Sequence, residues 1–165
     1  MEELLNGVES GSQQVSDMVD AIVGDKTKEI DEFIERVREM FLSDKEMNDG
    51  EIDRIMLQIP VYIYYLTRIL QDIDIRKGVS LENAKFYENE QLLLATGTVA
   101  EKQAKANNST IKNRVVSLAY KSATALVQGK MNAAMEILSS AKRVQQRRLE
   151  EMKLTKLAGN SVATF

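Results

Sequence analysis

Apolar residues recur at helical spacing along most of this chain of 165 residues. One apolar face covers 30–41, and a second begins at Ile52 and reaches Ile59. The most apolar stretch, 61–70, continues at the same spacing to Ile73, which favours a helix over a buried strand. One proline and eight glycines leave little room for the tight turns of a sheet. The pattern predicts an all-α protein.

Helix-breaking and capping residues divide this pattern into segments. Weak periodicity and three glycines in 1–24 predict a flexible acidic arm, which precedes a helical domain at 25–157. The capping-box spacing of 43–46 predicts the start of a short helix. Pro60 is expected to be the first residue of a helix, where its missing N–H costs nothing, and Gly78 is expected to end that helix.

The last part of the chain is expected to form a long helical hairpin over 81–157, followed by a tail at 158–165. Its first helix is predicted at 81–106, and the polar run 107–109 marks the break. The second helix would be about 70 Å long, at about 1.5 Å per residue. A rod of this length needs a partner along its whole length. The predicted architecture is therefore a long helical hairpin with shorter N-terminal helices, assembled into an oligomer.

The predicted final helix carries a stripe of apolar and small residues. Small side chains let helix axes approach closely, and the helix at 81–106 is too short to cover the stripe. Left exposed, the stripe would exceed the apolar patches that soluble monomers tolerate, so we expect a homo-oligomer. The stripe consists of Ile111, Val115, Leu118, Ser122, Ala125, Gly129 and Ala133, and it continues to Met135, Leu138 and Val144. The residues expected between copies are Leu118, Ala125, Gly129, Ala133, Leu138 and Val144.

Charge is distributed unevenly along the chain. The whole sequence has 22 basic and 25 acidic residues, for a net charge of −3. Residues 1–60 hold 16 acids and 6 bases, whereas residues 101–165 hold 4 acids and 12 bases. This contrast indicates an anionic partner for the basic end. The alternative is that the two ends neutralise each other, within one copy or between neighbours.

Basic residues in the last third of the chain are the candidate phosphate contacts, because cations that neutralise phosphates release condensed counterions. A basic helix C-terminus is also favoured by the helix dipole, and Glu150 and Glu151 dilute the patch. A solvated face and pairing between chains are therefore the alternatives. The candidate set is Lys102, Lys105, Lys112, Arg114, Lys121, Lys142, Arg143, Arg147 and Arg148.

Tyrosine rings supply a second kind of contact, since aromatic side chains stack on unpaired bases. The five tyrosines stand at positions 62, 64, 65, 87 and 120. Tyr62 and Tyr65 lie on or beside the apolar stripe, so core packing is expected for most of the five. Tyr64 is the one expected to be exposed.

The residue types behind most catalytic and metal chemistry are missing. With neither Cys nor His, the chain has no disulfide, zinc finger, cysteine nucleophile or histidine base. Asp31 and Glu35 share a solvated helix face, and Gly97 is interpreted as a close-packing position rather than a phosphate-binding loop. The acidic segment around Gly50 briefly resembles a calcium-binding loop. With Gly50 as the turn glycine, the loop would start at Lys45 and end at Met56, neither of which is a suitable ligand. We expect no enzymatic activity, no cofactor and no metal.

No apolar run approaches the roughly 20 residues of a membrane-spanning helix. The chain begins with acidic residues where a signal peptide carries basic ones. These features predict a cytoplasmic protein without a membrane partner.

Three segments between residues 59 and 154 resemble the recombination-mediator proteins of large tailed phages, the UvsY-type family. They are IPVYIYYLTRIL, LLLATGTVAEKQAKA and RVVSLAYKSATALVQGKMNAAMEILSSAKRVQQRRLEEMKL. The resemblance covers about 95 residues and lies in the order of a short helix, a helical hairpin and a long amphipathic closing helix. It implies a small oligomer that binds single-stranded DNA and helps to load a RecA-like recombinase over a single-strand binding protein. The compartment would then be the cytoplasm of the host cell.

A helical assembly protein is the alternative function. Such a protein would be a virion or scaffold component, or an inhibitor of a host protein, and it would act by protein–protein contact. Its acidic N-terminal region would dock on a basic partner, and its basic helix would form the contact between copies.

Overall fold

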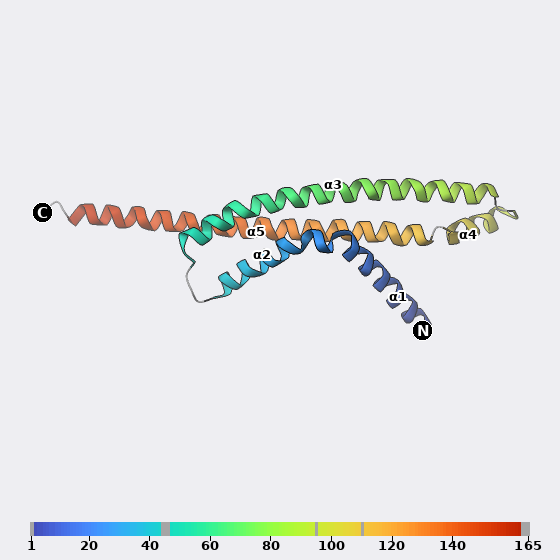
Figure 1. Cartoon of the computed structure of the whole chain (residues 1–165), viewed down its shortest axis with the longest axis horizontal. Helices are drawn as coiled ribbons and strands as arrows, with labels where there is room; N and C mark the ends of the chain where they lie inside the picture. Colours follow the sequence, from blue (N-terminus) through green and yellow to red (C-terminus); the bar gives the residue numbers. More distant parts are fainter. Residues whose placement is uncertain (1, 44–46, 95, 110, 163–165) are drawn as a thin grey trace. The chain divides into compact units, whose positions relative to one another are not determined.

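The computed structural model describes the backbone of residues 2–43, 47–94, 96–109 and 111–162, and the side chains of 9–43, 47–94, 96–104 and 111–157. Every regular element in these ranges is a helix, which confirms the all-α fold class (Figure 1). The elements are α1 (Glu2–Val19), the π-helix η1 (Asp20–Gly24), α2 (Asp25–Leu42), α3 (Asp49–Leu94), α4 (Val99–Ser109) and α5 (Ile111–Val162).

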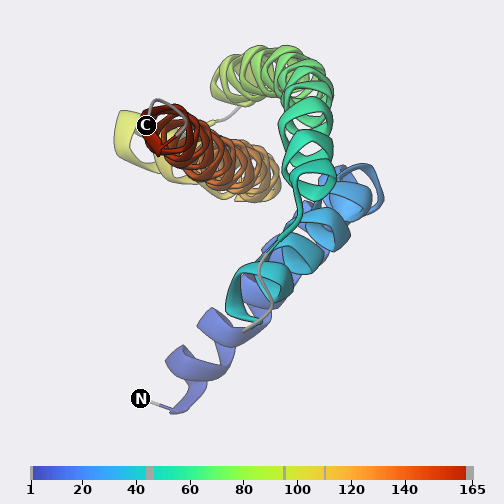
Figure 2. The ribbon, with the colours of Figure 1, turned by 90° about the vertical axis from the view of Figure 1, so that its left-hand side faces the viewer.

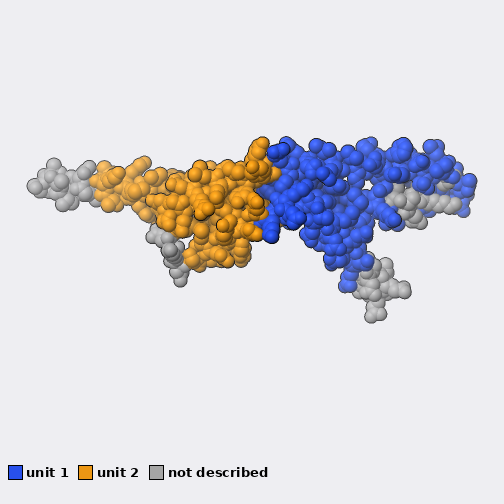
Figure 3. All heavy atoms as spheres, in the orientation of Figure 1, with its two compact units in different colours: residues 1–28, 66–129 blue, residues 29–65, 130–165 orange. Residues whose placement is uncertain are grey.

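The chain forms two compact units, which Figure 3 distinguishes by colour. Unit 1 consists of Met1–Lys28 and Leu66–Gly129, and unit 2 consists of Glu29–Tyr65 and Lys130–Phe165. The long helices α3 and α5 contribute to both units. Each unit is therefore built from segments that are far apart in the sequence.

Unit 2 packs parts of α2, α3 and α5 around an aliphatic core. Two polar contacts show that α3 and α5 are antiparallel there: Asp53 accepts a hydrogen bond from Gln145 at 3.1 Å, and Asp49 one from Arg148 at 2.6 Å. The rings of Phe33 and Tyr62 lie 5.2 Å apart and join α2 to α3. The buried side chains are Ile30, Phe33, Val37, Ile52, Ile55, Ile59, Ala134 and Ala141. Burial of each isoleucine contributes about 1.5–3 kcal/mol.

Unit 1 packs the second part of α3 against the first part of α5, which run side by side in Figures 1 and 2. The side of α5 that is buried here carries the small residues Ala119 and Ala123, and small side chains allow helix axes to approach closely. Lys26 at the start of α2 forms an ion pair with Asp72 of α3 at 3.4 Å. The buried side chains are Val19, Val23, Thr27, Leu66, Ile73, Ala119, Ala123 and Val127.

The segment expected to be a flexible arm is helical. Helix α1 runs through Gly11 without a break, and η1 follows it. Val23 is 1% exposed and Thr27 is 1% exposed, so the end of this segment belongs to the core. The Thr27 hydroxyl donates to the carbonyls of Val23 at 3.2 Å and Gly24 at 3.4 Å. These bonds satisfy backbone oxygens at the point where π-helical pairing gives way to α-helical pairing.

Helix α3 continues through both residues that were expected to bound a helix. Pro60 lies inside it, and Gly78 lies well before its end at Leu94. An interior proline costs a helix about 3 kcal/mol and an interior glycine about 1 kcal/mol. The buried residues Ile59 and Leu66 on either side of Pro60 contribute about 1.5–3 kcal/mol each, which offsets a cost of this size. The predicted boundaries at Pro60 and Gly78 are therefore wrong.

A reciprocal capping box starts α3 at a different place from the one predicted. Asn48 Oδ1 accepts a hydrogen bond from the backbone N–H of Glu51 at 2.9 Å, and Glu51 Oε2 accepts one from the backbone N–H of Asn48 at 2.7 Å. The predicted box began at Ser43, whose amide instead donates to Glu39 O at 3.0 Å and closes the last turn of α2. The rest of that predicted box, 44–46, lies outside the described residues.

A second capping box starts α4 and corrects the predicted helix at 81–106. Glu101 Oε2 accepts from the Thr98 amide at 2.8 Å, and Gly97 precedes this box with φ of 119°. Gly97 is therefore a turn residue, which corrects its interpretation as a close-packing position. The arm of the hairpin that faces α5 is α3, and the polar run 107–109 belongs to α4.

Gly97→Ala is expected to lower the free energy of unfolding by about 1–2 kcal/mol, because an L-residue is strained at this φ. An added Cβ would also lie 2.5 Å from Glu101 Oε2 and would displace the capping carboxylate. Urea denaturation measures the change. Gly78→Ala is the matched control: nothing lies within 4 Å of its added Cβ, so this variant should gain about 0.5–1 kcal/mol. A loss of stability from Gly78→Ala as well would show that helix propensity does not govern the Gly78 site.

Candidate functional site

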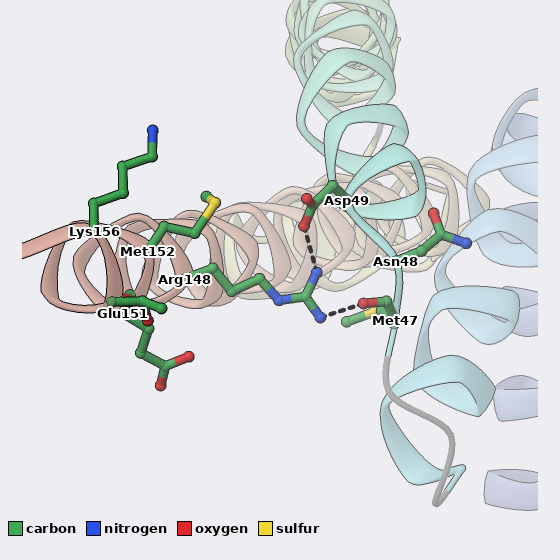
Figure 4. A pocket seen from close by; sticks show the side chains of 8 residues that line it. Met47, Asn48, Asp49, Arg148, Glu151, Met152 and Lys156 are labelled. Carbon is green, nitrogen blue, oxygen red and sulfur yellow. Dashed lines mark hydrogen bonds and ion pairs between the residues drawn. The ribbon is translucent and has the colours of Figure 1, made fainter. Parts of the chain in front are cut away.

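Arg148 of α5 contacts Met47 and Asp49, which lie just before and at the start of α3 (Figure 4). Its guanidinium donates to Asp49 Oδ1 at 2.6 Å and to the Met47 carbonyl oxygen. The Arg148 side chain is only 19% exposed, whereas that of Asp49 is 76% exposed. A groove of about 720 Å³ runs beside this contact. It is lined by Met47, Asn48, Asp49, Arg148, Glu151, Met152, Thr155 and Lys156.

The other members of the predicted cluster in unit 2 lie on the exposed side of α5. Lys142 and Arg143 are exposed and form no ion pair within the described part of the chain. Arg147 pairs with Glu151 at 3.0 Å, yet its side chain stays 82% exposed. Arg143 and Arg147 are one turn apart and share a face. Three of the four predicted cations of this cluster are therefore accessible to phosphate, and Arg148 is held by its own chain.

Unit 1 holds the remaining predicted cations. Lys112, Arg114 and Lys121 of α5 are exposed, and Lys102 of α4 is half-buried. The side chain of Lys105 lies outside the described residues. No acidic residue occurs in the sequence between Glu101 and Glu136, so α5 itself supplies no acidic side chain close to these cations. A surface of this kind attracts polyanions.

Part of the acidic N-terminal third neutralises α5 within the same copy. In unit 2, Asp31 of α2 pairs with Lys130, and Asp49 pairs with Arg148. The side chain of Lys130 is 18% exposed, so this contact is partly shielded from water. The two charged ends of the chain thus neutralise each other at Lys130 and Arg148. Lys142, Arg143 and Arg147, which point outward from α5, do not take part in these pairs.

The residues predicted to lie between copies occupy two environments. Leu118 is 51% exposed, and Ala125 and Gly129 are also exposed. Ala133, Leu138 and Val144 are half-buried. The residues of the predicted stripe do not form the face of α5 that is buried within the described part of the chain. That side lies about one residue further along the helix and consists of Ala119, Ala123, Val127, Ala134 and Ala141.

The tyrosines divide differently from the expectation. Tyr62 packs on Phe33, as core packing predicts, and Tyr64 is 61% exposed, which confirms the prediction for this residue. Tyr65 and Tyr87 are 56% and 52% exposed, so assigning them to the core is wrong. Their exposure follows from the register of α3, which buries Leu66 and Ile73 instead.

Two carboxylates have perturbed acidity. The hydrogen bond from Arg76 lowers the pKa of Asp72, and Lys26 adds to the effect. Hydrogen bonds from the Thr98 amide and hydroxyl lower the pKa of Glu101. A general acid needs the opposite shift, since it must hold its proton near neutral pH. These two carboxylates therefore act as ion-pair and capping groups.

The described residues form neither a metal site nor a membrane-spanning helix. No group of three or more carboxylates there is arranged to hold a metal ion. None of the helices in the described ranges has an apolar stretch that would reach across a bilayer. Comparison with protein-family models, curated proteins and solved structures finds no match, so the functional conclusion rests on the residues themselves.

Proposed function

We propose that the protein is a non-enzymatic, single-stranded DNA-binding mediator that helps to load a RecA-like recombinase over a single-strand binding protein. The observation that carries the proposal is the set of outward cations on α5, namely Lys142, Arg143 and Arg147 in unit 2 with Lys112 and Lys121 in unit 1. The resemblance of 59–154 to the UvsY-type family gives the proposal its particular role.

The proposed mechanism is multivalent binding. Each exposed cation on α5 contributes one weak phosphate contact, and several copies bound to one strand gain avidity without any strong site. The exposed side of α5 that carries Leu118, Ala125 and Gly129 supplies the contact between copies. An oligomer that gathers the strand in this way weakens the hold of a competing single-strand binding protein and presents DNA to the recombinase.

The test is the salt dependence of oligo(dT) binding to the full chain, followed by fluorescence anisotropy between about 50 and 200 mM salt. Five phosphate contacts, one for each of these outward cations, give a log–log slope of about −3.5 per protomer, because each contact on a single strand contributes about −0.7. Light scattering on the same samples should give a mass above that of one chain at micromolar concentration. Absence of binding, or a slope near zero, would contradict the DNA-binding proposal.

The second candidate is a helical assembly protein, and exposed apolar side chains favour it. Leu93 is 86% exposed, Leu57 is 73% exposed and Leu94 is 69% exposed, all on α3. Large apolar side chains exposed in this number suit a protein–protein interface. This candidate predicts an oligomer whose affinity for DNA is weak and insensitive to salt.

A further inference from the structure

The contact between α3 and α5 changes from apolar to polar along unit 1. On α3, a row at seven-residue spacing starts with the buried residues Leu66 and Ile73 and continues with Ser80 and Tyr87. On α5, the matching row runs from the buried Val127 through Tyr120 to Asn113. Polar residues in positions that face another helix weaken packing, and natural proteins keep them mainly where function requires them.

An open groove of about 360 Å³ lies where the two rows become polar. Its volume falls near the lower end of the range for small-ligand sites, about 300–1,000 Å³. The polar and aromatic side chains in its lining are Arg76, Ser80, Asn83 and Tyr87 of α3 with Asn113 and Tyr120 of α5. Arg76 donates to Asp72 at 3.1 Å, which fixes the guanidinium at the groove.

This set of side chains matches the chemistry of a nucleobase. Tyr87 is 52% exposed and presents a ring on which a base can stack. The amides of Asn83 and Asn113 each offer donors and an acceptor for the edge of a base. Lys112 and Lys121, which are exposed, adjoin Asn113 and Tyr120 in the sequence and supply charge for the flanking phosphates.

We propose that this groove binds an unstacked base of single-stranded DNA, with Tyr87 as the stacking residue and the two asparagines as hydrogen-bonding groups. The inference rests on the proposed function and adds to it a contact with bases, beside the contacts with phosphates. Because every base has a π-face, stacking here makes binding tolerant of sequence.

The experiment compares oligo(dT) with an abasic strand of equal length, using the full chain and three variants. Tyr87→Leu removes the ring, Tyr87→Phe keeps it, and Tyr64→Leu is the matched control, since Tyr64 is 61% exposed on α3 and does not line the groove. Anisotropy gives affinities, and thermal melts check that each variant is folded. The chain has five tyrosines and no tryptophan, so quenching of its intrinsic fluorescence reports stacking on tyrosine directly.

The expected result is that Tyr87→Leu weakens oligo(dT) binding by about 5- to 150-fold, which corresponds to one stacked base. Tyr87→Phe and Tyr64→Leu should bind oligo(dT) with the affinity of the unchanged protein. The abasic strand should bind Tyr87→Leu and the unchanged protein with equal affinity. Part of the fluorescence quenching by oligo(dT) should disappear in Tyr87→Leu and persist in Tyr64→Leu.

Three results would overturn the inference, and they separate it from the proposed function. If oligo(dT) and the abasic strand bind equally and Tyr87→Leu changes neither, the groove takes no base although DNA binding stands. If neither strand binds, the proposed function fails together with the inference. If Tyr87→Leu alters the subunit mass and not the affinity, the groove is covered by a second copy of the chain.

Discussion

Single-stranded DNA binding should weaken for every sequence alike when Lys142, Arg143 and Arg147 are all replaced by glutamine. The log–log salt slope should become shallower by about 2, because each lost phosphate contact removes about 0.7. Glutamine has nearly the helix propensity of lysine and arginine, so α5 should remain intact. Arg148 is left unchanged in this variant because it holds Met47 and Asp49. Anisotropy across a salt series measures the effect.

A control variant removes the same charge elsewhere. Lys28 and Arg38 of α2 and Lys85 of α3 are exposed and lie outside α5, so their joint replacement by glutamine changes the net charge equally. This control should keep the slope within about 0.5 of the unchanged protein if the contacts on α5 are specific. Equal losses in both variants would mean that total charge alone governs binding. An unchanged slope with a lower subunit mass would favour the assembly protein.

Arg148→Gln should lower the free energy of unfolding by about 2 kcal/mol, because it removes charge-assisted hydrogen bonds to a carboxylate and a part-buried carbonyl. The segment that begins at Met47 should also loosen. Hydrogen exchange at the Glu51 backbone amide should become faster, because this amide donates to Asn48 Oδ1 in the same segment. Urea denaturation and hydrogen exchange measure the two effects.

Arg147→Gln is the matched control for this change. It removes an exposed pair with Glu151 one turn along the same helix, which is worth only about 0.3–0.5 kcal/mol. Similar stability losses for the two variants would show that the contacts of Arg148 add nothing special. A stable Arg148→Gln with a shallower salt slope would instead make Arg148 a phosphate contact.

Helical periodicity alone was enough to predict the fold class, but not where the helices end. Gly78 and Gly97 look alike as isolated glycines, yet only Gly97 ends up in a turn. The local signal that distinguishes them is the capping-box spacing of Thr98 and Glu101, which directly follows Gly97. Asn48 and Glu51 have the same spacing and start α3. Cap spacing was thus the better guide at these two boundaries, whereas the same spacing at Ser43 did not mark a helix start, because the Ser43 backbone amide closes the last turn of α2.

The face that α5 buries was harder to predict than its existence. Alanine stands on several sides of this helix, for example at 123, 125, 133 and 134, so small size alone does not select the side that meets α3. The buried set contains Ala123 and Ala134, whereas Ala125 is exposed. Packing against distant parts of the chain determines which face of α5 is buried. The spacing of apolar residues within α5 does not predict this face.

The candidate cations show the same limit. Arg147 and Arg148 are consecutive, and consecutive residues on a helix point about 100° apart, so the two guanidinium groups leave α5 in different directions. Which of them turns inward depends on Asp49, almost a hundred residues away in the chain. A basic cluster in a sequence therefore identifies a charged helix, and the partners that fold against it decide which charges remain exposed.

The seven-residue spacing of the buried rows has a consequence for how the length of this protein can change. On α3, the row is Ile52, Ile59, Leu66 and Ile73, and on α5 it includes Val127, Ala134 and Ala141. An insertion of seven residues in each helix would add about 10 Å to the pair and keep every later side chain on its face. An insertion of one residue would rotate the following stretch by about 100° and expose its buried row. Viable length variants of this chain should therefore differ by matched sevens in α3 and α5.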